Sequence, residues 1–135
     1  NPHAIRPWQH VLEPLSGYLL LAQTLYKEGQ SAARAWNFGP HDEGARPVSW
    51  IAGRMSELWG GGARWELTED SPQPHEATYL KLDISRARTY LHWSPTWTLQ
   101  QTLESIVNWQ RAWLNGSNAQ ELCLQEIARF RHSWG

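Results

Sequence analysis

The sequence predicts an α/β fold in which helices predominate. Apolar residues recur at helical spacing in three long stretches, at residues 13–28, 47–60 and 98–114. Short extended stretches bounded by Gly or Pro lie before and between them, at residues 3–6 and 33–39. So few short strands make a poor independent sheet. We therefore expect that part of the sheet is supplied by other polypeptide.

Composition and charge narrow the class of protein. The chain has 135 residues, of which 41% are apolar and 19% charged, as is typical of one globular domain. A net charge of −1 gives no electrostatic signature of a nucleic-acid binder. One cysteine, Cys123, excludes an internal disulfide and fits a reducing compartment. No signal peptide is visible, and no apolar run approaches the ~20 residues of a membrane span, so we expect a cytoplasmic protein that binds neither membrane nor nucleic acid.

The first helix is predicted over residues 13–28. Pro7 disfavours helix just before it, which leaves residues 3–6 extended. Pro14 is tolerated only in the first turn of a helix, so the helix must begin close to it. Gly29 is a good helix stop.

The middle of the chain is predicted to alternate strands with one helix. Residues 33–39 read as a strand, and residues 41–46 as a polar loop. Pro47 stands at a favourable first helical position, and Gly60 marks the end of that helix. A further strand is predicted around residues 64–68.

The C-terminal part is predicted to be helical. Asp83 is a suitable N-cap for a short helix. Thr98 and Gln101 have the spacing of a capping box before a helix over residues 99–114.

The last predicted helix covers residues 119–131, behind a second capping box formed by Ser117 and Gln120. We expect it to dock through three apolar side chains, Leu122, Ile127 and Phe130. The domain organisation expected from these patterns is a main portion over residues 1–116 and a helical tail over residues 117–135.

Three segments of the sequence are distinctive enough to suggest a protein family. They are "NPHAIRPWQHVLEPLSGYLLLAQTLY", "AWNFGP" and "HEATYLKLDISRARTYLHWSPTWTLQQTLESIVNW", in this order. Together they resemble the C-terminal part of the extended short-chain dehydrogenase/reductase enzymes, most closely the CDP-glucose 4,6-dehydratases, over about residues 1–114. The resemblance implies the substrate-binding portion of an extended Rossmann-type nucleotide-sugar enzyme, lacking the dinucleotide-binding half.

The sequence lacks the motifs that would bind and use a dinucleotide. It contains no GxxGxxG, and its one glycine run, residues 60–62, has the wrong spacing and context. No tyrosine is followed four residues later by a lysine, so the catalytic Tyr-x-x-x-Lys of the resembled enzymes is absent. We expect no catalytic residue and no cofactor in this chain, with NAD bound by the full-length enzyme. Asn1 is expected to be an internal residue of a longer polypeptide, or a start left by truncation or proteolysis. The expected partner of this chain is the missing N-terminal half or a partner subunit.

Four residues are candidates for substrate binding. The resemblance implies that Arg6 reaches the substrate diphosphate, which suits a guanidinium; a junction salt bridge is the alternative. Asn37, at the end of a predicted strand, matches an asparagine near the substrate phosphates of the resembled enzymes; the alternative is an asparagine that closes its own turn. His75 and Glu76 follow a proline in a loop, and the resemblance supports a nucleotide-facing role for both. Their pattern does not favour a metal site.

The function expected from the sequence is therefore binding of a CDP-glucose-like nucleotide sugar, as part of an enzyme that dehydrates sugar nucleotides in deoxysugar biosynthesis. The chain would be inactive alone. The alternative is a non-enzymatic binding or scaffold domain derived from the same lobe. An apolar face left open by the missing half would favour self-association, which makes a homo-oligomer a further expectation.

Overall fold

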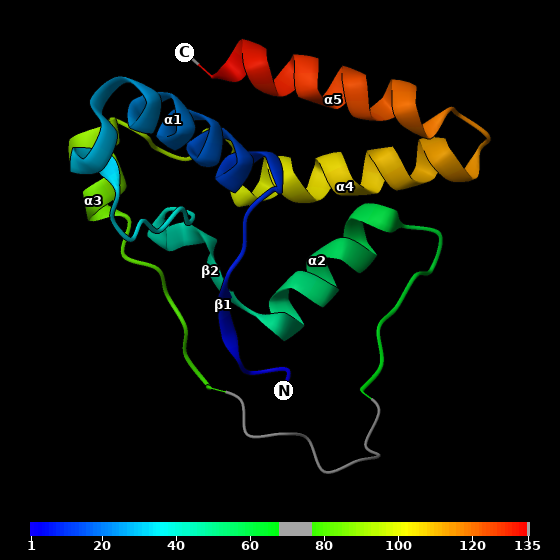
Figure 1. The fold of residues 1–135 in the computed structure, drawn as a ribbon. Coiled ribbons are helices and arrows are strands. Elements are labelled where there is room, and N and C mark those ends of the chain that lie inside the picture. Colours follow the sequence, from blue (N-terminus) through cyan, green and yellow to red (C-terminus); the bar gives the residue numbers. More distant parts are fainter. Residues whose placement is uncertain (68–76, 135) are drawn as a thin grey trace.

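A computed structural model of the chain describes residues 1–67 and 77–134 and shows a helix-rich α/β arrangement with a small two-stranded sheet (Figure 1). The elements follow one another as β1 (Ile5–Pro7), α1 (Leu12–Glu28), η1 (Gly29–Ala32), η2 (Asp42–Gly44), β2 (Ala45–Pro47), α2 (Val48–Trp59), α3 (Ser85–Leu91), α4 (Leu99–Leu114) and α5 (Ala119–Ser133). The prediction of an α/β fold with an excess of helix is confirmed.

The sheet is a short antiparallel ribbon. β1 pairs with β2, and Arg6 stands directly opposite Arg46. On its other side Ile5 forms a parallel bridge with Tyr79, in which the Ile5 amide donates to the Thr78 carbonyl at 2.9 Å. The extended stretch expected at residues 3–6 is confirmed in part, because β1 begins within it and ends one residue beyond it, at Pro7.

Two predicted strands are wrong. Residues 33–39 are irregular, and the strand that pairs with β1 comes instead from 45–47, which overlaps the predicted loop. A side chain holds the irregular segment in place, because the Gln9 Nε2 donates to the Phe38 carbonyl at 2.9 Å. Residues 64–67, the described part of the other predicted strand, also form no strand.

The predicted ends of α1 and α2 are confirmed to within a residue. Gly29 and Gly60 follow these helices with φ of 63° and 66°, a left-handed conformation that glycine adopts without strain. Pro47 is the N-cap of α2 and not its first helical residue.

Of the three caps predicted for the C-terminal helices, only that of α4 is confirmed. The N-cap of α3 is Ile84 and not Asp83, although the Asp83 carboxylate accepts the Ser85 amide at 2.8 Å. The capping box of Thr98 and Gln101 before α4 is present. The predicted box of Ser117 and Gln120 is wrong, because Asn118 is the N-cap of α5 and accepts the Glu121 amide.

The hydrophobic core lies between the inner side of α1 and α3. Phe38 and Trp93 meet edge to face at its centre, with ring centroids 5.0 Å apart. Gly17 of α1 packs directly on Phe38, since a Cβ at this glycine would lie 2.2 Å from the ring. The absence of a side chain at position 17 is thus what brings α1 and the segment around Phe38 into contact.

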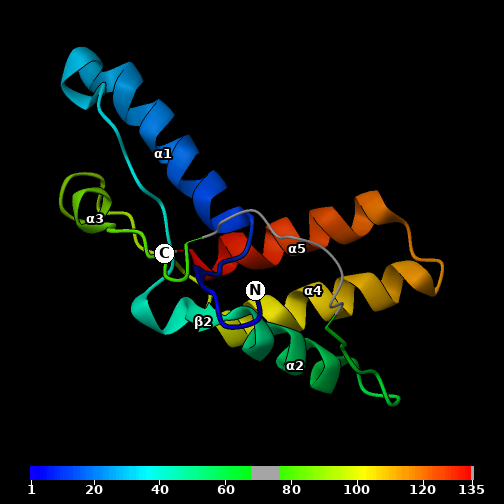
Figure 2. The ribbon, with the colours of Figure 1, turned by 90° about the horizontal axis from the view of Figure 1, so that it is seen from below.

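α4 lies between α2 and α5, and α5 runs beside it (Figures 1 and 2). Of the three side chains expected to dock α5, Phe130 is buried and meets Trp97 edge to face at 5.2 Å, and Leu122 is partly buried. Ile127 does not dock, because it is 42% exposed.

No helix in the described part of the chain is long and apolar enough to cross a membrane.

Candidate functional site

Arg6 is the central residue of β1 and is half-buried. Its Nη1 donates to the Ile5 carbonyl at 2.8 Å. The antiparallel register places it opposite Arg46, so both side chains project from the same face of the ribbon. Like charges directly opposite one another destabilise a strand pair. The register therefore brings two positively charged side chains together on this face.

Arg46 is exposed and is held by neutral groups. Its Nε donates to the Glu43 carbonyl at 3.1 Å, and its guanidinium lies 5.3 Å from the centre of the Trp50 ring. Among the described residues, Arg46 forms no ion pair with a carboxylate.

Asn37 is exposed in the irregular segment before Phe38. Its side-chain amide donates to the Asp83 carbonyl at 3.2 Å and so ties this segment to the start of α3. This contact spans 46 residues, so Asn37 does not simply close its own turn. Its side-chain oxygen remains an acceptor for a ligand donor.

Trp8 and Gln9, which follow β1, tie this strand to two other segments of the chain. The Trp8 indole donates to the Arg46 carbonyl at 2.9 Å, and the Trp8 amide donates to the Gly44 carbonyl at 3.0 Å. The neighbouring Gln9 bonds the Phe38 carbonyl, next to Asn37. The other two predicted site residues, His75 and Glu76, lie outside the described residues.

A dinucleotide phosphate cradle does not fit the glycine run at residues 60–62. This run follows the C-terminal end of α2, where the Gly60 amide bonds back to the Ser56 carbonyl. Anions bind at helix N-termini, where amide donors point outward, whereas a C-terminus presents carbonyl oxygens and negative partial charge. The described residues also contain no group of three metal-ligating side chains that could hold an ion.

Sequence reasoning missed a buried carboxylate, Glu13, which is fully shielded from solvent. It accepts the Thr96 amide at 2.9 Å and the Trp97 amide at 2.6 Å, just before α4. Burial raises the pKa of Glu13, and the two backbone hydrogen bonds oppose that rise. Because both oxygens are engaged by backbone and closed to solvent, Glu13 joins α1 to α4 and is no general acid or base for a ligand.

His10 extends this buried polar connection toward α5. Its Nδ1 accepts the Leu12 amide at 3.3 Å, and its Nε2 lies 3.7 Å from a carboxylate oxygen of Glu126. Burial lowers the pKa of His10, with the Glu126 carboxylate raising it and the Arg129 guanidinium lowering it as smaller effects. The spacing of Glu13, Ser16 and Gly17 (i, i+3, i+4) on the core side of the predicted helix was the available signal for a polar buried face.

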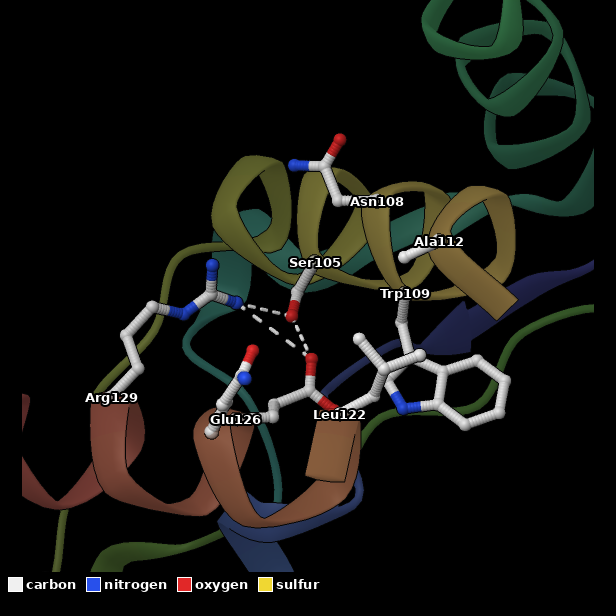
Figure 3. A pocket seen from close by; sticks show the side chains of 8 residues that line it. Ser105, Asn108, Trp109, Ala112, Leu122, Glu126 and Arg129 are labelled. Atoms are coloured by element: carbon white, nitrogen blue, oxygen red, sulfur yellow. Dashed lines mark hydrogen bonds and ion pairs between the residues drawn. The ribbon is translucent and has the colours of Figure 1, made fainter. Parts of the chain in front are cut away.

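A groove of about 310 Å³ lies between α4 and α5 (Figure 3). It is lined by Ser105, Asn108, Trp109, Ala112, Leu122, Gln125, Glu126 and Arg129. The Ser105 hydroxyl donates to Glu126 and accepts from Arg129, and the Arg129 guanidinium also stacks 4.7 Å over Trp97. These polar groups satisfy one another across the two helices, so the groove is a helix–helix junction. It contains none of the predicted site residues.

Comparison with known proteins supports the resemblance found in the sequence. No family model matches the chain. The chain is 50% identical over 130 residues to a protein of Salmonella typhimurium (strain LT2) named CDP-glucose 4,6-dehydratase. The match covers 96% of this chain and 36% of the relative. At that length it necessarily extends into α5, beyond the residues 1–114 on which the sequence resemblance rests.

Proposed function

We propose that this chain is the nucleotide-sugar-binding portion of a CDP-glucose 4,6-dehydratase-like enzyme. The observation that carries the proposal is the 50% identity to the Salmonella protein of that name, sustained over 96% of this chain. Because the chain spans only 36% of that relative, the remaining polypeptide of such an enzyme would supply the Rossmann-type half, the NAD and the catalytic tyrosine. This chain would be inactive alone.

The part assigned to this chain is to hold the diphosphate of the substrate. Arg6 provides a planar guanidinium on β1, and Arg46 adds a second positive charge on the same face of the ribbon. Guanidinium groups bond phosphate oxygens through paired, charge-assisted hydrogen bonds. Asn37 would add an amide contact from the neighbouring segment. The diphosphate of a CDP-glucose-like substrate carries two negative charges that paired guanidinium groups can bond.

The proposal is tested by titrating CDP-glucose, UDP-glucose and CDP into the chain by calorimetry. The titration is done with the chain alone and after co-expression with the part of the Salmonella protein outside the matched segment. In at least one of these forms, CDP-glucose is expected to bind more tightly than UDP-glucose. Loss of a hydrogen bond to a charged group costs about 1.5–3 kcal/mol, so Arg6→Gln is expected to weaken binding roughly 10- to 100-fold.

Arg88→Gln is the matched control, because Arg88 is an exposed arginine on α3, away from β1. This variant should bind like the unaltered chain. Absence of binding in both forms would defeat the proposal, and equal binding by Arg6→Gln would remove Arg6 from the site.

The second candidate is a non-enzymatic binding or scaffold domain derived from the same lobe. The observation that favours it is the absence of GxxGxxG and Tyr-x-x-x-Lys from the sequence. Full 4,6-dehydratase activity on CDP-glucose after co-expression with the rest of the Salmonella protein would argue against it. Binding of the sugar nucleotide without any turnover in that complex would favour it.

A further inference from the structure

The turn between α4 and α5 contains the only Asn-Gly dipeptide of the chain, Asn115-Gly116. It lies where the chain leaves α4 and reverses into α5 (Figure 1). Asn115, Gly116 and the neighbouring Asn118 are all exposed. Exposure therefore does not distinguish the two asparagines of this turn, whereas the residue that follows each of them does. The other asparagines of the chain are followed by Pro2, Phe38, Trp109 and Ala119.

The residue after an asparagine decides how readily the asparagine side chain reacts with the backbone. The attacking group is the backbone nitrogen of that next residue, which bonds to the carbonyl carbon of the side chain. A Cβ on the next residue crowds this approach, and glycine has none. At Gly116, no atom beyond the adjacent residues lies within 4 Å of the place that a Cβ would occupy. A ring formed between Asn115 and Gly116 is therefore not obstructed by the rest of the described chain.

The two asparagines of the turn also differ in how their side chains are held. The Asn118 side-chain oxygen caps α5 by accepting the Glu121 amide at 3.1 Å. Asn115 is the C-cap of α4, and its side chain forms no hydrogen bond with any described residue. The side chain of Asn115 can therefore turn toward the Gly116 nitrogen, whereas the side chain of Asn118 is engaged.

We propose that Asn115 is a site of spontaneous deamidation, with water as the co-reactant. The Gly116 nitrogen loses its proton to solvent base and bonds to the Asn115 Cγ. The bond between Cγ and the side-chain nitrogen breaks, and this nitrogen leaves as ammonia after it takes a proton from solvent. No group is oxidised or reduced, and the product is a five-membered cyclic imide.

Water then opens the imide at either of its two carbonyl carbons, and the Gly116 nitrogen regains its proton. One opening leaves an aspartate at position 115. The other leaves an isoaspartate, in which the backbone runs through the former side chain. Both products replace a neutral amide by a carboxylate.

The fold controls the rate of this reaction through the hydrogen bonds of the turn. The Gly116 amide donates to the Trp113 carbonyl at 3.0 Å, and the Ser117 amide donates to the Ala112 carbonyl at 3.0 Å. The first of these bonds must open before the Gly116 nitrogen can attack. The turn should therefore react more slowly in the folded chain than in the unfolded chain.

The product alters the end of α4. A carboxylate at the C-cap meets the negative end of the helix dipole, which is unfavourable. Arg111, one turn earlier, already donates to the Trp59 carbonyl, so neutralising the new charge would compete with that contact. Isoaspartate also lengthens the backbone inside the hydrogen-bonded turn. We therefore expect deamidation to loosen the corner between α4 and α5.

The test incubates the folded chain in mildly alkaline buffer and quantifies deamidation at each asparagine by peptide mapping with mass spectrometry. Asn115 should deamidate at least tenfold faster than Asn118, and equal rates would overturn the proposal. Unfolding in urea should accelerate the reaction at Asn115. An unchanged rate in urea would refute the protective role of the Gly116 hydrogen bond.

Asn115→Gln is the matched control, because glutamine keeps the amide but its reaction would require a less favourable six-membered ring. Labelling with a protein isoaspartate methyltransferase should detect isoaspartate in the incubated unaltered chain and not in this variant. Equal labelling of both would place the reaction at another residue and overturn the assignment.

The structural consequence is measured on the deamidated fraction, which ion exchange separates by its additional negative charge. Hydrogen exchange at the Gly116 and Ser117 amides should be at least fivefold faster in this fraction than in the unmodified chain. Equal exchange would refute the loosening of the corner. None of these measurements depends on binding of a nucleotide sugar, so they stand apart from the proposed function.

Discussion

Replacement of Glu13 by glutamine is the sharpest test of how this fold is held together. Glu13→Gln keeps the shape of the side chain and removes its charge. In the unaltered chain, one carboxylate accepts two backbone amides, those of Thr96 and Trp97. Glutamine can accept only one of them, and its NH₂ group then faces the other donor.

The expected cost follows from these two contacts. A hydrogen bond to a charged group contributes about 1.5–3 kcal/mol, and a buried donor left without an acceptor costs about 1–3 kcal/mol. Removing a buried charge relieves part of its desolvation cost, which works in the opposite direction. We expect a net loss of about 2–3 kcal/mol in the free energy of unfolding, which lowers Tm by roughly 10 °C in a domain of this size.

The pH dependence of this loss has a defined sign. Burial raises the pKa of Glu13 above the 4.5 of the unfolded chain. The folded state therefore binds a proton more readily, so the contribution of Glu13 to stability is full below pH 4.5 and is lost as the pH rises through the folded pKa. Glutamine does not titrate. The destabilisation caused by Glu13→Gln should accordingly be larger at pH 5 than at pH 7.5.

Urea unfolding followed by tryptophan fluorescence measures both effects, with Glu28→Gln as the control. Glu28 is exposed at the end of the same helix, so its replacement should change stability by less than about 0.5 kcal/mol. A Glu13→Gln variant as stable as the control would refute the assigned connection between α1 and α4. A penalty that grows with rising pH would refute the direction of the Glu13 pKa shift.

Two further variants test the packing and the buried imidazole. Gly17→Ala would force a Cβ to within 2.2 Å of Phe38 and should destabilise the chain by about 1–3 kcal/mol. Gly53→Ala on α2 meets only a side-chain atom at 3.8 Å and should stabilise it by about 0.5–1 kcal/mol; thermal melts that rank the two the other way would contradict this packing. Because burial lowers the pKa of His10, the unfolded chain takes up a proton first, and stability present above pH 6.5 should fall on acidification. His10→Gln should flatten urea midpoints measured between pH 7.5 and 5.5, and an unchanged slope would assign the effect to other groups.

The helices could be predicted from the sequence because their signals are local. Gly29 and Gly60 end helices through their own backbone freedom, and Thr98 with Gln101 caps α4 within one turn. The cap of α5 was missed because Asn118 and Ser117 are adjacent and both are good N-caps, so sequence alone did not decide between them.

The strands could not be predicted equally well, because pairing depends on contacts distant in sequence. Residues 33–39 have a strand-like composition, yet they pair with no strand in the described part of the chain. β2 is three residues long and gained its structure from β1, about forty residues earlier. A three-residue strand carries too little pattern for its pairing to be recognised in advance.

The candidate site was predicted only as residue identities. The sequence indicated Arg6, but not that Arg46 stands opposite it, because register is a property of the folded ribbon. It indicated Asn37, but not that its amide bonds the Asp83 carbonyl. The nucleotide-facing role of these residues stays a prediction, as does that of His75 and Glu76.

The segment "RPWQHVLEPLSGY" is the strongest part of the resemblance, and most of its distinctive residues have architectural contacts. Trp8 and Gln9 tie β1 to the segments around residues 46 and 38, Glu13 binds the turn before α4, and Gly17 gives room to Phe38. Similarity in these residues is therefore sufficiently explained by a shared fold. Arg6 differs, because it stands opposite a second arginine on the same face of the ribbon, where two guanidinium groups could bond a diphosphate. Binding measurements on Arg6 variants therefore test the proposed substrate-binding role, whereas variants of Glu13 or Gly17 test only the stability of the fold.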